Sequence, residues 1–359
     1  MLDSVVTDIP HAKVEAVTDR VVREFQLAAD KVAAHHMSPA RYPMPADRAS
    51  TEQLLAQRFA RLSDVLRKQA ADRLSADLRT TTVRAERLGD LRKVDLRSPA
   101  PVGAQLSRLP WPARLRFPAA ELSKVPTSLL PEVYEAAPAA KDAAPAAKNG
   151  APAASEGRPR RLELRIHRVE AVDTTGEWGR DDIHLGGTGS DEHGDTYRIA
   201  RFKVHGFHAG DVLTYVPPRQ FHRFSLTDAT ACFPRSYFVT VVLAEADWAG
   251  FADYLNRLLD AVRARLVEAL RSATGEALPL GGPVGVLIGI AVGAAVNRVF
   301  DYLADRWGDE VFKPVTVRAT LPSPTARWGG ESPVSGPRTL EYGGFGGKYR
   351  VVYDWRLCD

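Results

Sequence analysis

The stretch Gly281-Gly-Pro-Val-Gly-Val-Leu-Ile-Gly-Ile-Ala-Val-Gly293 places a glycine at every fourth position, at Gly281, Gly285, Gly289 and Gly293. In a helix these glycines lie on one face, because residues four apart are separated by about one turn. A face without side chains lets a neighbouring element approach closely, either in a membrane or in a tightly packed soluble fold. The stretch therefore predicts a helix that packs through its glycine face.

The composition around these glycines raises the question of a membrane span, since residues 277–297 contain no charged residue. A spanning helix needs about 20 apolar residues. The apolar run after Pro283 extends only from Val284 to Val296, and runs of about 10 to 14 residues are more typical of a buried core helix. We expect close packing against a sheet or a neighbouring helix, with membrane insertion as the alternative.

Two amphipathic helices are predicted near the N-terminus, over residues 14–36 and from Ser50 to about residue 79. Ser50 and Gln53 have the spacing of a capping box, in which the two side chains satisfy backbone N–H groups at a helix start. The second helix would run for about eight turns and pair with the first as a hairpin.

The charge of the chain argues against a nucleic-acid partner. The chain has 48 Lys and Arg residues against 44 Asp and Glu residues, a formal net charge of +4. Basic residues are densest in the second helix, but acidic residues alternate with them and no aromatic residues are interleaved. This pattern is typical of a solvated, ion-paired helix face, and we expect no nucleic-acid partner.

A proline-rich arm follows the helices at residues 99–130, with apolar residues that need a surface to cover them. The arm is expected to dock on its own fold or on a partner subunit. Residues 1–135 therefore predict a helical docking domain that binds a protein partner, and an oligomer is compatible with this pattern.

Residues 136–157 contain a heptapeptide based on Ala-Ala-Pro-Ala-Ala-Lys, repeated three times with variation. Regular proline prevents a long helix, and no large apolar side chain is present to be buried. The segment predicts a semi-extended linker between two modules.

Beyond the linker, at residues 158–359, hydrophobic residues alternate as in strands. The expected strands are 162–166, 197–204, 212–216, 221–226, 237–243, 312–321 and 349–357. Short strands separated by Gly, Pro and Asp turns favour an antiparallel β-sandwich, and residues 245–311 read as a helical hairpin inserted into it. The fold class predicted for the whole chain is therefore α+β and multidomain.

Acidic residues gather after the first of these strands. The candidate metal ligands are Asp173, Asp181, Asp182, Asp191, Glu192 and Asp195. Calcium takes six to eight oxygen ligands, and the interleaved glycines would let backbone carbonyls turn toward an ion. The spacing is not that of an EF-hand. Calcium is thus a candidate cofactor, with a solvated acidic loop as the other interpretation.

Motifs for catalysis and nucleotide binding are not found, including the nucleophile elbow, the phosphate-binding loop and the His-Glu-x-x-His zinc motif. No catalytic residue is assigned. The Gly-Gly-Phe-Gly-Gly run at 343–347 precedes a strand, which indicates a hairpin turn rather than a nucleotide loop. The sequence favours a protein that is not an enzyme.

Several short segments between residues 160 and 320 resemble an uncharacterised bacterial β-sandwich module. They are Gly-Arg-Asp-Asp-Ile-His-Leu-Gly-Gly at 179–187, Gly-Phe-His-Ala-Gly-Asp at 206–211, Ala-Glu-Ala-Asp at 244–247 and Gly-Asp-Glu-Val-Phe at 308–312. The resemblance implies the fold of that region and carries no activity.

The first ten residues lack the basic and apolar regions of a secretory signal, so synthesis in the cytoplasm is expected, with any export by a non-classical route. Whether Cys232 and Cys358 pair is left open. The leading hypothesis is a binding or structural protein in which the docking domain is tethered to a sandwich with a possible calcium site. The alternatives are a membrane-active, pore-forming or toxin-like protein that uses the glycine-rich hairpin, and a metal-dependent hydrolase.

Overall fold

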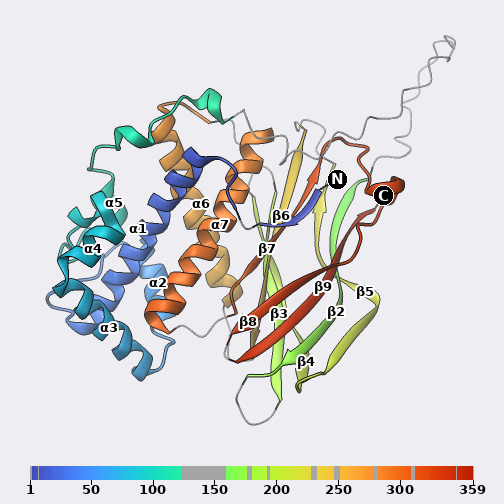
Figure 1. Cartoon of the computed structure of the whole chain (residues 1–359), viewed down its shortest axis with the longest axis horizontal. Helices are drawn as coiled ribbons and strands as arrows, with labels where there is room; N and C mark the ends of the chain where they lie inside the picture. The colour runs from blue at the N-terminus through green and yellow to red at the C-terminus, as the bar shows by residue number, and fades with distance from the viewer. Residues whose placement is uncertain are drawn as a thin grey trace.

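The computed structural model describes residues 2–6, 8–122, 159–175, 180–191, 195–227, 233–245, 251–278, 282–308, 312–344 and 346–358. It has an N-terminal helical region followed by two antiparallel sheets, with a helical hairpin inserted between two of the strands (Figure 1). The α+β class and the antiparallel sandwich with inserted helices are confirmed. The predicted linker lies outside the described residues.

The N-terminal region begins with a short strand and continues with helices. These elements are β1 (Leu2–Val5), α1 (Ala12–Met37), α2 (Thr51–Phe59), α3 (Asp64–Arg79), α4 (Thr81–Leu88) and α5 (Val102–Leu106), with 3-10 turns η1 (Gly89–Lys93), η2 (Ala113–Leu115) and η3 (Ala119–Glu121).

The first predicted helix is confirmed as α1, whereas the single long second helix was wrong. Ser50 caps α2, because its side chain accepts a hydrogen bond from the Gln53 backbone N–H. The chain then turns, and Ser63 caps α3 in the same way by accepting from the Leu66 N–H at 3.3 Å. A second capping serine inside the apolar pattern thus starts a new helix where the period alone suggested continuation.

Eight strands form most of the two sheets. They are β2 (Arg161–Asp173), β3 (Asp181–Ser190), β4 (Thr196–Phe207), β5 (Val212–Ser225), β6 (Arg235–Glu245), β7 (Val315–Leu321), β8 (Arg338–Gly344) and β9 (Gly347–Cys358). Sheet A has the order β1-β7-β6-β3-β4, and sheet B has the order β5-β2-β9-β8, with all neighbours antiparallel. Residues from the facing sides of both sheets form one hydrophobic core.

Two features of the sandwich differ from the sequence-based expectation. The segment predicted as an acidic loop contains strand β3, and the two strands expected within 212–226 are one bulged strand, β5. The predicted hairpin turn before the last strand is confirmed, with Gly344 paired to Gly347 and β8 as its first strand. Cys358 is a free thiol, and Cys232 lies outside the described residues.

The inserted hairpin consists of α6 (Phe251–Thr274) and α7 (Gly282–Trp307), between β6 and β7. Figure 1 shows three layers: the helices, then sheet A, then sheet B. Helix α7 lies against sheet A with its glycine face. A Cβ atom added at Gly289 would lie 2.2 Å from the Phe238 ring, and one at Gly293 would lie 3.3 Å from Thr316. These two glycines therefore let the helix approach strands β6 and β7.

The helices from the two parts of the chain share one hydrophobic core. Apolar residues of α1, α2, α6 and α7 form a single buried cluster, to which Phe238 and Val242 of sheet A contribute. Strand β1 also pairs with β7 of the sandwich, with Leu2 opposite Thr320. The helical hairpin of this chain thus covers an apolar face of the N-terminal region. A protein partner for this region stays a prediction.

The proline-rich arm docks on the N-terminal helices through buried charged side chains. Lys31 is fully buried and donates from Nζ to the carbonyl oxygens of Ser98 and Ala100 at 2.6 and 2.8 Å. Glu52, also fully buried, accepts from the Val102 N–H at 2.6 Å. Of the two predicted surfaces for the arm, its own fold is the one observed for residues 99–122.

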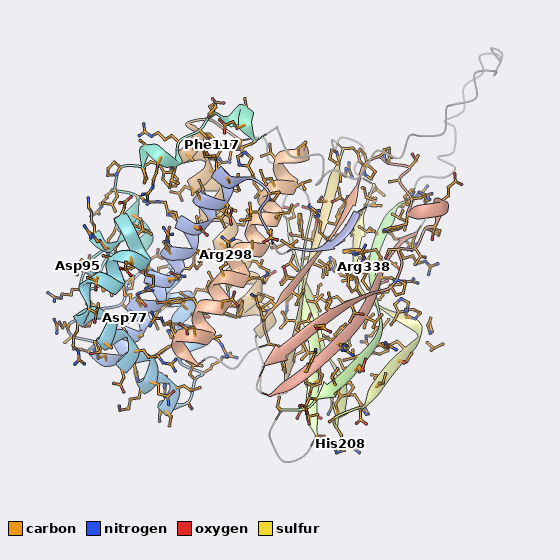
Figure 2. All side chains as sticks on the ribbon, in the orientation of Figure 1. Asp77, Asp95, Phe117, His208, Arg298 and Arg338 are labelled. Carbon is orange, nitrogen blue, oxygen red and sulfur yellow. The ribbon has the colours of Figure 1, made fainter. Side chains whose placement is uncertain are left out.

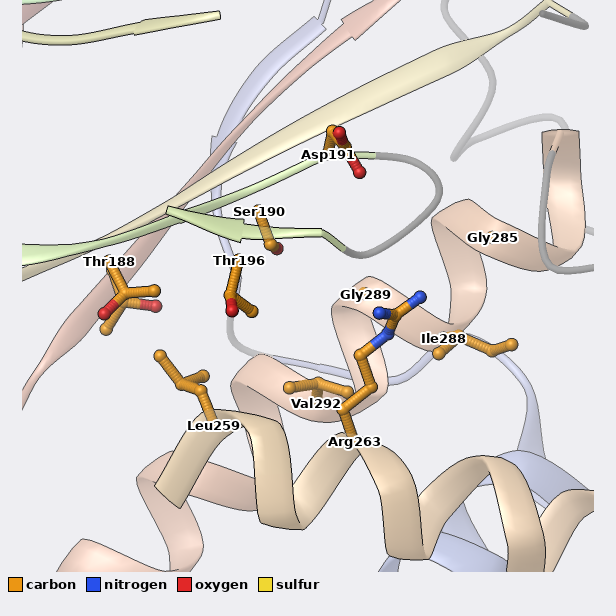
Figure 3. Close-up of a pocket in the computed structure, with 11 residues that line it drawn as sticks. Thr188, Ser190, Asp191, Thr196, Leu259, Arg263, Gly285, Ile288, Gly289 and Val292 are labelled. Carbon is orange, nitrogen blue, oxygen red and sulfur yellow. The ribbon is translucent and has the colours of Figure 1, made fainter. Parts of the chain in front are cut away.

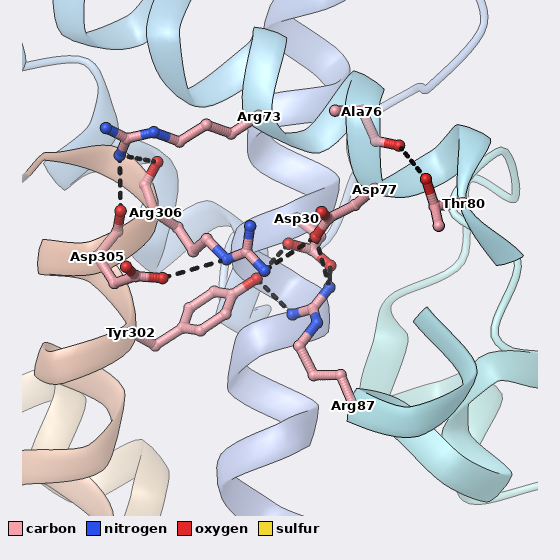
Figure 4. Close-up of polar contacts among 9 residues, drawn as sticks. All are labelled: Asp30, Arg73, Ala76, Asp77, Thr80, Arg87, Tyr302, Asp305 and Arg306. Carbon is pink, nitrogen blue, oxygen red and sulfur yellow. Dashed lines mark hydrogen bonds and ion pairs between the residues drawn. The ribbon is translucent and has the colours of Figure 1, made fainter. Parts of the chain in front are cut away.

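A polar network joins the N-terminal helices to α7 (Figure 4). The Tyr302 hydroxyl donates to Asp30 at 2.5 Å, and Arg87 donates to Asp30 at 2.7 Å and to the Tyr302 oxygen at 2.5 Å. Arg306 of α7 pairs with Asp77 of α3 at 3.0 Å. Burial is the largest cause of a pKa for Tyr302 well above its usual value. The network fixes the register of α7 against α1 and α3.

Candidate functional site

The predicted metal ligands do not come together at one site. Asp181 and Asp182 begin strand β3, and Asp191 follows its last residue. Strand residues advance about 3.3 Å each, so the two ends of β3 are about 30 Å apart. Among the described residues, no group of three or more His, Cys, Asp or Glu side chains is arranged to hold a metal ion.

The carboxylates at the start of β3 have protein partners. Asp181 is 5% exposed and accepts from the backbone N–H and the hydroxyl of Thr175, at 2.7 and 3.0 Å, and from the Tyr349 hydroxyl. Asp182 accepts from Lys203 at 2.7 Å, and this hydrogen bond is the largest cause of its lowered pKa. Asp173 accepts from the adjacent Thr174 N–H. These contacts brace the ends of β2 and β3.

At the other end of β3, Asp191 and Asp195 shape the turn into β4. The Asp191 N–H donates to the Asp195 carbonyl at 3.2 Å, and the Asp195 N–H donates to the Asp191 carboxylate at 3.0 Å. The Tyr197 hydroxyl also donates to Asp191, at 2.9 Å. Glu192 lies outside the described residues. Calcium binding by the acidic residues stays a prediction.

Two features singled out from the sequence meet at a small pocket between sheet A and the inserted hairpin (Figure 3). Asp191 contributes to it from the β3–β4 turn, and Gly285 and Gly289 contribute from α7. The space available inside is about 30 Å³, which is enough for one or two water molecules and too small for a metabolite. Gly281 lies outside the described residues.

The polar side chains of this pocket come from the sheet and from α6. Arg263 reaches into it, and its pKa is lowered chiefly by burial, which outweighs the nearby carboxylates of Asp191, Asp195 and Asp260. The Thr188 hydroxyl is buried without a hydrogen-bond partner in the described structure. The pocket thus offers a hydration site rather than a catalytic arrangement.

Helix α7 is the segment that would enter a membrane if the protein were membrane-active. Residues Pro283–Trp307 are long and apolar enough to cross a bilayer, but 78% of the relevant window is buried inside the protein. A core helix of a soluble protein passes the same test.

A larger hollow lies beside β4 and β5, the edge strands of the two sheets. This feature, called the basic groove below, has a volume of about 440 Å³. It is lined by residues 198–202 of β4 and 219–223 of β5. From residue 196 to residue 225 the chain has five Lys or Arg residues and one Asp. The groove is therefore a concentration of positive charge on a protein of nearly balanced charge.

Aromatic contacts hold part of this charge in place. The guanidinium of Arg219 lies over the Phe202 ring, 3.8 Å from its centre, and Phe221 is buried beneath the groove. The His222 ring leans on β3, where only a glycine fits, because a Cβ at Gly189 would lie 2.5 Å from the His222 Nε2 atom. Burial lowers the pKa of His222 to about 4, so arginines alone carry the charge of the groove at neutral pH.

An ion pair neutralises one part of the groove. Arg198 pairs with Asp253 of α6 at 2.9 Å. Arg219 and Arg223 are exposed and form no ion pair with any residue that the structure describes. These two side chains at the β5 side are the cations available to a ligand.

The outer face of sheet B also carries charged side chains, and several of them pair with one another. Arg165 donates to both oxygens of the buried Asp354, at 2.9 and 2.6 Å, and His167 lies 2.8 Å from the same carboxylate. Arg350 and Lys348 pair with Glu341 at 3.2 and 3.6 Å. Figure 2 shows the side chains on both sheets, with Arg338 on β8 and His208 at the β4–β5 turn. The basic groove is thus the better candidate for an electrostatic binding site.

Comparison with known proteins gives no further guidance. No family model, no curated protein and no solved structure matches the chain.

Proposed function

We propose that this protein is a non-enzymatic interaction module that binds an acidic segment or surface of a partner protein in the basic groove. The observation that best supports this proposal is the pair of exposed arginines, Arg219 and Arg223. They line a hollow of about 440 Å³ on the open side of the sandwich. Arginine presents a planar fork of donors that fits carboxylates, and Arg219 is already oriented by its contact with Phe202.

The strand edges favour recognition by side chains over addition of a peptide strand. The pairing of β4 with β3 is irregular, with a register shift between Leu185 and Gly187 of β3. In β5, Pro217 and Pro218 fall where the pairing jumps from Arg219 to Thr214. Bulges and prolines are common protections of an exposed sheet edge. Ligand contacts are therefore expected from the groove side chains.

An acidic protein fits better than a nucleic acid. Proteins that bind single strands stack bases on exposed aromatic rings, whereas Phe202 is covered by Arg219 and Phe221 is buried. The groove is also short, with four arginines along its two walls. Its size suits a few carboxylates on a folded surface or an extended segment.

Fluorescence anisotropy with a labelled ten-residue glutamate peptide tests this function. Replacing Arg219 and Arg223 by Gln should weaken binding roughly five- to thirtyfold, since exposed carboxylate contacts contribute about 0.5 to 1 kcal/mol each. Binding should also weaken with added salt, because exposed charges are screened.

The matched control replaces Arg92 and Lys93, two exposed cations of the helical region, by Gln, and should bind the peptide like the wild type. Equal losses in the two double variants would show that only net charge matters, and would contradict a binding site in the groove. Tighter binding of an oligonucleotide of the same charge would overturn the choice of a protein partner.

The membrane-active alternative rests on the length and apolar composition of Pro283–Trp307. It requires α7 to leave the helical core. A liposome-leakage assay with wild type and Gly289→Leu tests it, and the absence of leakage at any calcium concentration or pH would exclude this function.

A further inference from the structure

Arg318 is a buried cation for which the described residues provide no ion-pair partner. It lies at the centre of β7, is 4% exposed, and its Nε and Nη1 atoms have no hydrogen-bond partner in the described structure. Burying an unpaired charge costs several kcal/mol, so buried charges in proteins are nearly always paired. Because no described residue supplies the counter-charge of Arg318, a bound anion is a candidate for this role.

The position of Arg318 on β7 places it beneath the helices. Its neighbours Val317 and Ala319 belong to the core between the two sheets, so Arg318 points to the opposite face of sheet A. Its cross-strand partner on β6 is Phe238, the residue that fits against Gly289 of α7. The guanidinium is therefore enclosed between sheet A and the helical layer.

One hydroxyl pair lies on either side of Arg318 on the same face, two residues away along β6 and β7. Thr320 is 2.7 Å from Ser236, and Thr316 is 2.9 Å from Thr240, each pair within hydrogen-bond distance between the two hydroxyl oxygens. A bond between two hydroxyls uses one of their two hydrogens. Each pair thus keeps one O–H donor that no described residue accepts.

We propose that Arg318, together with the free O–H donor of one neighbouring hydroxyl pair, binds a small monovalent anion, such as chloride or a simple carboxylate, between sheet A and the helical layer. Guanidinium N–H and hydroxyl O–H groups are all donors, and the described part of this face holds no carboxylate that pairs with Arg318. Such a set of donors favours an anion over a cation or a neutral ligand. The lowered pKa of Arg318, caused by burial, agrees with an uncompensated charge.

Anion-dependent thermal unfolding of the full chain tests this site. At constant ionic strength, replacing gluconate, which is too large to enter, by chloride or formate should raise the unfolding midpoint of the wild type by about 3 °C or more. The Arg318→Met variant should lose this anion dependence. The Arg235→Met variant, which removes another buried arginine from sheet A, should keep it.

Chloride-35 NMR relaxation tests the site in the wild-type protein, so it does not require that any variant folds. Wild-type protein should broaden the chloride signal, and formate should remove the broadening by competition. Anion dependence that persists in Arg318→Met, or wild-type protein that neither broadens the chloride signal nor gains stability, would overturn the site and leave ordered water as the occupant.

Discussion

At the scale of single residues, Gly289 is a position where the structure tolerates little change. An added Cβ would lie 2.2 Å from the Phe238 ring, and overpacking of this kind costs about 1 to 3 kcal/mol. We expect Gly289→Ala to be destabilised by this amount in chemical unfolding, although alanine favours helices. Gly293→Ala, whose Cβ would meet Thr316 at 3.3 Å, is the matched control and should lose less.

A second variant makes the Gly289 prediction specific. Combining Gly289→Ala with Phe238→Leu shortens the ring that the new methyl group meets. The double variant should recover part of the stability lost in Gly289→Ala. A loss equal to the sum of the two single losses would mean that Phe238 is not the cause.

His222 gives the protein a pH dependence that can be assigned to one residue. Its pKa of about 4 in the folded protein lies below the value of about 6.5 expected for an unfolded chain. The unfolded state therefore binds the proton first, and stability falls as the pH drops from about 6.5 to 4. We expect His222 to account for a loss of about 2 to 3 kcal/mol over this window.

Urea unfolding at several pH values measures this contribution. His222→Gln should flatten the curve between pH 6.5 and 4, whereas His208→Gln, in the exposed β4–β5 turn, should leave the slope unchanged. A slope that is the same in all three proteins would contradict burial of a neutral His222.

At the scale of elements, the network around Asp30 attaches α7 to the N-terminal helices. Asp30→Asn removes the charge that faces Arg87 while keeping the side-chain volume. Loss of one partner of a buried ion pair costs about 3 to 5 kcal/mol, and the unfolding free energy should fall by a similar amount. Asp72→Asn, which breaks an exposed pair with Lys68, should change it by less than about 1 kcal/mol.

Periodicity predicted the elements whose pattern is local. Helix α1 and the inserted hairpin follow from apolar spacing, and the glycine face of α7 follows from its four-residue repeat. Strand β3 was missed because Gly186, Gly187 and Gly189 have no side chains with which to show alternation. Strand β1 was missed because its pairing with β7 joins residues more than 300 positions apart.

The candidate site could not be predicted from local sequence patterns, because its residues are distant in the sequence. Arg198 and Arg219 are 21 positions apart and meet only because β4 and β5 lie on the same open side of the two sheets. The excess of basic residues between 196 and 225 was the available signal. Likewise, the glycine spacing indicated close packing, but only the fold identifies Phe238 as the residue packed there.

At the scale of the whole molecule, the helical layer is built from two segments that the proposed linker connects. Residues 8–122 share their core with α6 and α7, and β1 completes sheet A. Cleavage at a protease site inserted after Ala147 should therefore leave two fragments bound to each other. Size-exclusion chromatography of the cut protein should show one peak at the size of the intact chain.

The fragments tested separately complete this experiment. Residues 1–122 alone should lack a cooperative unfolding transition, because their apolar face needs α6 and α7. Fragments that elute apart and unfold independently would support the division into separate modules that the sequence suggested.

The shared helical core also has a consequence for folding during synthesis, because its two parts are made at different times. About 200 residues separate α1 from α6, which corresponds to a delay of roughly 10 to 40 s at typical rates of synthesis. During that interval the apolar faces of α1 and α2 leave the ribosome before the helices that cover them exist. We therefore expect the N-terminal segment to need protection by chaperones, and its native structure to form only after translation has passed α7.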